Sequence, residues 1–167
     1  MMVLSSRCDA AVVLVIASFL GSSAIHAAER NVRANEVPRA VHETIAHKYP
    51  QATVISYTKE IEHGSVSYEV SLRSAGRTTD VGVSPEGRIL IEEDRIAQKD
   101  LPPEVSRALA GSADGRGRVE RIERIVEPGK DRSTRFEILV RSGEQRIELT
   151  FERDGRLIKR EQIRRRP

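Results

Sequence analysis

Metal-binding chemistry would need several ligand side chains that converge on one point. Beyond the first 28 residues the histidines are His42, His47 and His63. His42 and His47 are five positions apart, about 140° around a helix, so they do not share a ligand face. The acidic run at 92–94 lacks the interleaved spacing of a calcium loop. We therefore expect surface histidines and no metal site.

Motifs for covalent or phosphate chemistry are also missing from the sequence. It contains no Gly-x-Ser-x-Gly elbow, no glycine-rich phosphate loop and no His-Glu-x-x-His segment. Carboxylates are numerous, but charges that alternate along a strand normally face solvent. The sequence predicts no catalytic residue, no cofactor and no enzymatic activity.

Charged residues that alternate with apolar ones remain as candidates for binding. Within 66–72 and 136–141, every second residue is apolar, which is typical of strands with one buried and one wet face. Ordinary solvation is one interpretation of such a wet face, and contact with a partner is the other. The candidate partner contacts are Glu69, Arg73, Asp80, Glu137, Arg141, Glu148 and Glu152.

Two short helices are expected to support these strands. Val37, Val41, Ile45 and Tyr49 fall four apart, and Pro50 ends the segment. A second helix is expected from the same spacing at Leu101, Val105 and Leu109, with glycines at 111–117 ending it. Helices of about three turns are too short to be stable alone, so each must pack on a sheet.

Eight strands follow from the alternation and from glycine-containing turns such as Asp154-Gly155. They are expected at 53–62, 65–73, 77–84 and 88–96, and again at 118–127, 133–141, 144–152 and 156–163. Both series begin after a helix that starts near a proline, at Pro38 and Pro102. The predicted fold is α+β, a tandem repeat of one helix packed on a four-stranded antiparallel β-sheet. The repeats are assigned to residues 29–97 and 98–163.

Residues 1–28 have the pattern of an export signal. Arg7 precedes a short apolar run at 10–20, and small residues follow. We expect cleavage after Ala24, Ala27 or Ala28, with no membrane-spanning segment left after cleavage. Cys8 is the only cysteine of the 167 residues, so no disulfide is expected in the exported domain. The predicted location is periplasmic or secreted.

The sequence resembles the PepSY-like family, which is also described as β-lactamase-inhibitor-like. The resemblance rests on Val-Pro-x-x-Val at 37–41, Lys-Tyr-Pro-Gln-Ala at 48–52, Tyr-Glu-Val at 68–70 and Pro-Glu-Gly-Arg-Ile-Leu at 85–90. It covers nearly the whole chain after the signal as two tandem copies. The second copy lacks the Lys-Tyr-Pro element, and Tyr57 stands where a tryptophan is expected. The resemblance implies an exported bacterial protein and brings no catalytic residues.

The resulting functional prediction is a non-catalytic module that binds an envelope or secreted protein or peptide through a sheet face or strand edge. The alternative is an anionic envelope component bound by the arginine-rich second repeat and the basic tail at 164–167. Residues 101–163 carry 14 basic and 12 acidic residues, against 7 and 9 in 37–96. Glutamates interleave with the arginines and few aromatic residues are present, so nucleic acid is not expected as a partner.

Overall fold

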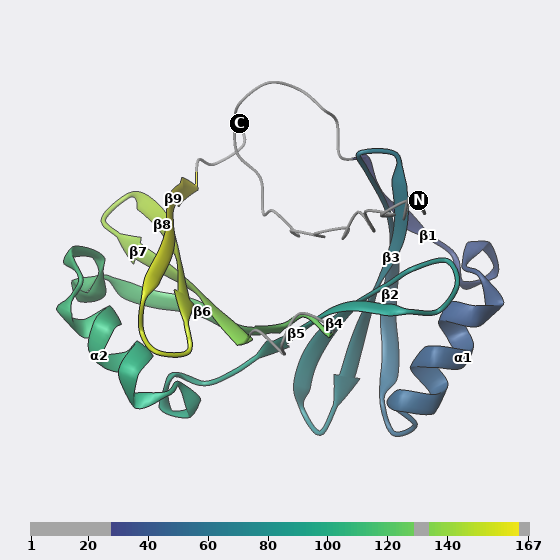
Figure 1. Cartoon of the computed structure of the whole chain (residues 1–167), viewed down its shortest axis with the longest axis horizontal. Coiled ribbons are helices and arrows are strands. Elements are labelled where there is room, and N and C mark those ends of the chain that lie inside the picture. Colours follow the sequence, from purple (N-terminus) through teal and green to yellow (C-terminus); the bar gives the residue numbers. More distant parts are fainter. Residues whose placement is uncertain (1–27, 129–133, 164–167) are drawn as a thin grey trace, which may run out of the picture.

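One antiparallel sheet runs through the whole described part of the chain. The computed structural model describes residues 28–128 and 134–163, and within them nine strands pair in sequence order (Figure 1). The strands are β1 Ala28–Val32, β2 Thr53–Glu62, β3 Ser65–Ser74, β4 Arg77–Val83, β5 Ile89–Arg95, β6 Arg118–Val126, β7 Thr134–Ser142, β8 Gln145–Glu152 and β9 Leu157–Ile163.

Two short α-helices connect these strands. Helix α1 covers Arg39–Lys48 between β1 and β2, and α2 covers Pro103–Gly111 between β5 and β6. Three 3-10 turns, at Ala34–Glu36, Gln98–Asp100 and Ala113–Arg116, flank them. No helix in residues 28–128 and 134–163 is both long and apolar enough to cross a membrane.

The predicted α+β fold, a tandem repeat of one helix on a four-stranded sheet, is wrong, although each predicted strand and helix is present within about two residues. Strand β5 pairs with β6, from Glu92 opposite Val126 to Arg95 opposite Glu123. The two sets of four strands therefore form one nine-stranded sheet, which β1 extends at the β2 edge. The physical reason is that β5 and β6 would otherwise each leave a row of unpaired backbone groups.

Both helices lie on the outer side of the curved sheet (Figure 1). Val41 and Ile45 of α1 pack with buried side chains of β3 and β4, among them Leu72. Val105 and Leu109 of α2 pack in the same way against β6, β7 and β8. The sheet thus has two separate apolar cores on one face, one beneath each helix.

Register shifts bend the sheet at corresponding places in its two halves. They occur between Val54 and Ser56 in β2 and between Val119 and Arg121 in β6. Two more occur where β4 meets β5 and where β8 meets β9. Because a bulge increases local twist and bends its strand, these shifts favour the strong curvature seen in Figure 1.

The turns that follow β4 and β8 fix each helix against the sheet. Gly87 and Gly155 both have positive φ, at 87° and 88°. A Cβ on Gly87 would lie 2.8 Å from the Ala40 carbonyl oxygen, and one on Gly155 would lie 2.6 Å from that of Glu104. Glycine is therefore required at both turns for its conformation and for the close approach of the helix.

Candidate functional site

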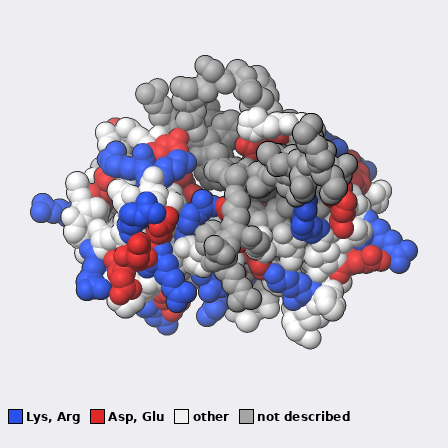
Figure 2. Space-filling model, in the orientation of Figure 1, with Lys and Arg blue, Asp and Glu red and all other residues white. Residues whose placement is uncertain are grey.

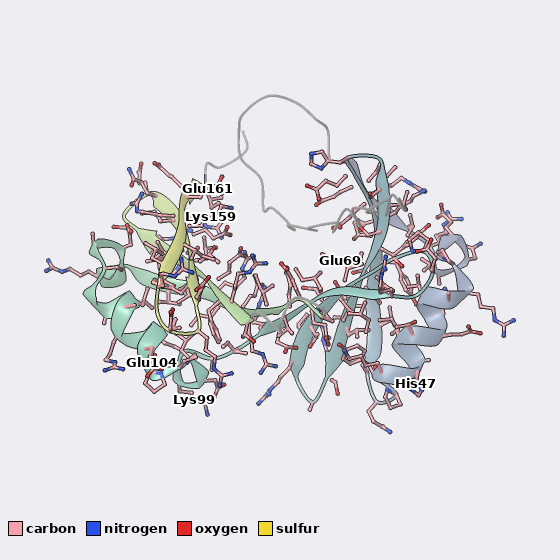
Figure 3. All side chains as sticks on the ribbon, viewed as in Figure 1. His47, Glu69, Lys99, Glu104, Lys159 and Glu161 are labelled. Atoms are coloured by element: carbon pink, nitrogen blue, oxygen red, sulfur yellow. The ribbon has the colours of Figure 1, made fainter. Side chains whose placement is uncertain are left out.

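The candidate site is the face of the sheet that points away from α1 and α2, inside its curve; we call it the open face. Tyr68, Val70 and Leu72 of β3 point into the core, so Glu69 between them lies on the open face. In Figure 3 Glu69 lies inside the curve, whereas Glu104 and His47 belong to the helices outside it. Strand alternation is thus what positions the open-face side chains.

All seven side chains predicted as partner contacts lie on the open face. Strand register places Asp80 beside Ser71, Arg141 beside Arg146 and Glu152 beside Arg135, and the other positions follow by alternation. The seven are spread over β3, β4, β7 and β8 and do not form one compact group. Their role in binding a partner remains a prediction.

A carboxylate cluster occupies the centre of the open face, where the two halves of the sheet join. Asp80 lies directly opposite Glu93, and Glu123 lies directly opposite Glu137. Like charges directly opposite each other on paired strands repel, so this arrangement costs stability. The members of the carboxylate cluster are Glu69, Asp80, Glu93, Glu123, Glu137 and Glu148.

Two members of the carboxylate cluster, Glu93 and Glu123, were not among the predicted site residues. The three acidic side chains of the run at 92–94 have different environments. Glu92 accepts hydrogen bonds from Tyr49 and Lys48 at the end of α1, and Asp94 accepts one from Thr79. Glu93 alone reaches the open face, and only the unpredicted β5–β6 pairing brings it near Glu123.

Burial and mutual repulsion disfavour the ionised form of these carboxyl groups. Burial, then the charges of Glu123 and Glu137, raises the pKa of Glu93 from 4.5 to about 8. Burial and, to a smaller extent, the negative charge of Asp80 raise the pKa of Glu69 to about 7. Burial and, to a smaller extent, the negative charge of Glu148 raise the pKa of Glu137 to about 7. Near neutral pH the cluster therefore carries less than its full negative charge.

Cations border the cluster mainly on the side of β6 and β9. Arg121 lies 3.0 Å from Glu123 and 3.7 Å from Glu148. Lys159 on β9 lies 2.7 Å from Glu161 and 4.0 Å from Glu148. Within the described residues, Glu69, Glu93 and Glu137 form no ion pair with a lysine or arginine.

Two buried oxygens beside the cluster lack a hydrogen-bond partner within the described residues. They are Oε2 of Glu148, a side chain only 2% exposed, and Oγ1 of Thr150. Thr150 lies directly opposite Glu137. Oε2 of Glu148 nevertheless lies 3.7 Å from the guanidinium group of Arg121, so an ion pair compensates the charge of this oxygen.

The histidines of the described residues do not form a metal-binding group. His42 contacts the Ala34 carbonyl oxygen at 2.9 Å and the Tyr57 hydroxyl at 3.1 Å, so it has a structural role. His47 and His63 are exposed. No group of three potential metal ligands occurs within residues 28–128 and 134–163.

Many arginines of the second half are paired with carboxylates. Glu120 pairs with Arg118, Arg141 and Arg146, at 3.0, 2.5 and 2.9 Å. The hydrogen bond from Arg141, followed by those from the other two, lowers the pKa of Glu120 to about 2. Arg160 binds both oxygens of Asp114. Figure 2 accordingly shows basic and acidic atoms interleaved over the β6–β9 half.

A pocket of about 240 Å³ lies on the seam between the two halves. Its lining includes Arg77, Arg95 and Arg124, together with Asp94 and Asp100. Arg124 is already paired with Asp94, and Arg95 lies 3.5 Å from Glu123. The mixed charge and existing ion pairs leave little free positive charge for an anionic ligand.

Comparison with known proteins supports the fold. No protein-family model matches the chain, and no curated protein matches it. A solved structure of a BLIP-like protein from Bacteroides fragilis has 23% sequence identity and a TM-score of 0.62, over 76% of this chain and 86% of that one. A putative periplasmic protein from Bacteroides eggerthii has 18% identity and a TM-score of 0.68, over 76% and 89%. A DUF2874 family protein from Bacteroides uniformis has 18% identity and a TM-score of 0.66, over 75% and 89%.

These similarities establish a BLIP-like fold for the chain. The resemblance seen in the sequence is thus supported in part, at the level of the fold alone. Membership of the PepSY-like family and a duplication into two tandem copies find no support in these comparisons. At such low identity the comparisons carry no information about individual binding residues.

Proposed function

We propose that this chain is an exported, non-catalytic module that binds a protein or peptide partner of the cell envelope through its open face. The observation that carries the proposal is the open face itself: both helices lie on the opposite face (Figure 1), and the open face carries charged side chains of β3, β4, β7 and β8. The BLIP-like and putative periplasmic neighbours support an exported binding role. Curved sheets offer a wide, rigid surface whose charges select the partner.

The alternative is an anionic envelope component bound by the second half and the basic tail. The ion pairs of Arg118, Arg141 and Arg146 with Glu120 weigh against it, because paired arginines provide little uncompensated charge. The tail at 164–167 lies outside the described residues. We therefore favour the open face.

A charge exchange on β3 tests the proposal without changing net charge. The double substitution Glu69→Arg and Arg73→Glu keeps the formal charge of the open face but exchanges the positions of a negative and a positive side chain on β3. The matched control, Arg39→Glu with Glu43→Arg, exchanges an exposed ion pair of α1 on the outer side. Each variant and the parent chain are used to capture proteins from envelope extract, which are quantified by mass spectrometry.

The proposal expects at least one protein that the parent and the α1 control retain and that the β3 exchange loses about tenfold or more. Equal capture by all three chains would exclude the open face as the binding surface. Capture that depends instead on residues 164–167 and falls steeply with salt would favour the anionic alternative. Hydrolysis of a substrate by the purified chain would contradict a non-catalytic module.

A further inference from the structure

We propose that two copies of this chain associate through the outer edge of β9, so that their sheets continue into one another. The two β9 strands pair antiparallel, related by a twofold axis at Arg160. This inference concerns an edge of the sheet and does not depend on what the open face binds. It follows from the unpaired edge of β9, from the pairing of the corresponding strand β5 and from the order of charges along β9.

Strand β9 ends the sheet. Among the described residues it pairs only with β8. Its outer edge therefore presents backbone N–H and C=O groups to which no described strand is bonded. Leu157 and Ile158 of β9 are 44% and 39% exposed, and they are two of the four exposed large apolar side chains of the described residues. Such an edge favours the addition of a further strand.

Strand β5 shows that the corresponding edge of the first half accepts an antiparallel strand. β5 and β9 have equivalent places, because each follows a glycine turn, at Gly87 or Gly155, and each meets its inner neighbour with a register shift. The outer edge of β5 pairs with β6 through residues 92–95. The outer edge of β9 lacks such a neighbour in the described part of the chain, and a strand of a second copy would take that place.

The charges of β9 are complementary to themselves when two copies run antiparallel. With Arg160 opposite Arg160, Lys159 of each copy lies directly opposite Glu161 of the other. Opposite charges at directly paired positions attract. Figure 3 shows Lys159 and Glu161 together on β9, where they already form an ion pair of 2.7 Å. Two copies would join two such pairs into one group of alternating charge.

Other antiparallel registers of β9 on β9 lack this match. A shift by two residues keeps every side chain on its own face of the sheet, but it places Glu161 opposite Glu161 or Lys159 opposite Lys159. The proposed register also brings the exposed Leu157 of one copy near Ile163 of the other. Charge and apolar contact therefore select the same register.

The two central arginines do not oppose this register. Arg160 lies opposite Leu149, a core residue, so its side chain belongs to the helix side of the sheet. Its guanidinium group donates hydrogen bonds of 2.8 and 2.9 Å to the two carboxylate oxygens of Asp114. The charge of each Arg160 is therefore balanced within its own copy.

The other free edge of the described sheet, β1, fits β9 less well. Its acidic and its basic residue, Glu29 and Arg30, are adjacent and point to opposite faces, so they cannot match Lys159 and Glu161 together. Pairing of β9 with β1 would also be head-to-tail and would extend into filaments. The twofold pairing is closed, and it keeps the open faces of both copies on one side as a continuous surface.

Sedimentation velocity over a range of concentrations tests the inference on the predicted exported form, residues 28–167. Glu161→Lys and Lys159→Glu each place like charges opposite one another in a dimer of identical copies. An equal mixture of the two variants restores opposite charges at both positions, and so does the double substitution in one chain. The controls Glu43→Lys and Arg39→Glu make the same changes of net charge at an exposed ion pair of α1.

We expect a weak dimer of the parent chain, with Kd of about 10–100 µM, because the edge is short. Each single variant of β9 should raise Kd about tenfold or more, whereas the mixture and the double substitution should return it to within about threefold of the parent. The controls should change Kd less than about twofold. Circular dichroism verifies that each variant is folded.

Nuclear magnetic resonance spectra of the parent give a second measurement that needs no substitution. Amide shifts that depend on protein concentration should centre on β9. A parent chain that remains monomeric at about 1 mM, or association that grows beyond the dimer, would overturn the inference. Dimerisation of Glu161→Lys as tight as that of the parent would overturn it as well. Capture of a partner by the open face is measured separately, so the proposed function and this inference can fail independently.

Discussion

Replacing Phe151 by alanine should lower the free energy of unfolding by about 3–5 kcal/mol. Phe151 is only 1% exposed and lies directly opposite Phe136, in the apolar core between α2 and the sheet. Truncation removes most of an aromatic side chain from a packed region and leaves a cavity that the rigid strands cannot close. Urea denaturation followed by circular dichroism measures the loss.

Leu157→Ala is the matched control for this prediction. Leu157 lies on β9 directly opposite Phe151, but it is 44% exposed. Its truncation should cost less than about 1 kcal/mol, because much of the side chain already contacts water. Similar losses for the two substitutions would mean that Phe151 is not enclosed by α2 and the sheet as described.

The second large effect is a fall in stability as the pH rises from about 5 to about 8.5. The pKa values of Glu69, Glu93 and Glu137 are raised in the folded chain to about 7, 8 and 7. The folded state therefore binds more protons than the unfolded state in this window, and its stability declines with rising pH. One unit of pKa shift corresponds to about 1.4 kcal/mol, and the three groups share neighbours, so we expect a loss of about 3 kcal/mol.

Glu93→Gln with Glu137→Gln should flatten this pH profile, because an amide does not ionise. The variant should be more stable than the parent at about pH 8.5 and nearly equal to it at about pH 5, by urea denaturation at each pH. Glu43→Gln, on the exposed surface of α1, should leave the profile unchanged. A rise in the stability of the parent chain between about pH 5 and about pH 8.5 would contradict the raised pKa values of the carboxylate cluster.

Local sequence patterns were sufficient to predict both α-helices and eight of the nine strands of the described residues; β1 at Ala28–Val32 was not predicted. Strand β8 at Gln145–Glu152 was predicted at 144–152, since Ile147, Leu149 and Phe151 alternate with polar residues and glycine turns border the segment. Helix α2 followed from Val105 and Leu109, which occupy one face. Periodicity determines such elements because it reflects which side of each is buried.

The assembly of the elements could not be predicted in this way. Pairing of β5 with β6 joins strands that are separated by α2, and no local pattern marks which edges meet. The same pairing creates the centre of the open face, so Glu93 and Glu123 were missed while Glu69 and Glu137 were assigned to the correct face. The expectation of a wet open face also failed at Glu148, which the curvature of the sheet and its neighbours bury almost completely.

Nuclear magnetic resonance titration of the glutamate side-chain carboxyl carbons tests the central claim most directly. The claim is that the pairing of β5 with β6 brings carboxylates together on the open face, with too few neighbouring cations to balance their negative charge. The expected result is a midpoint near pH 8 for Glu93 and near pH 7 for Glu69 and Glu137. Midpoints near 4.5 for all three would contradict the account.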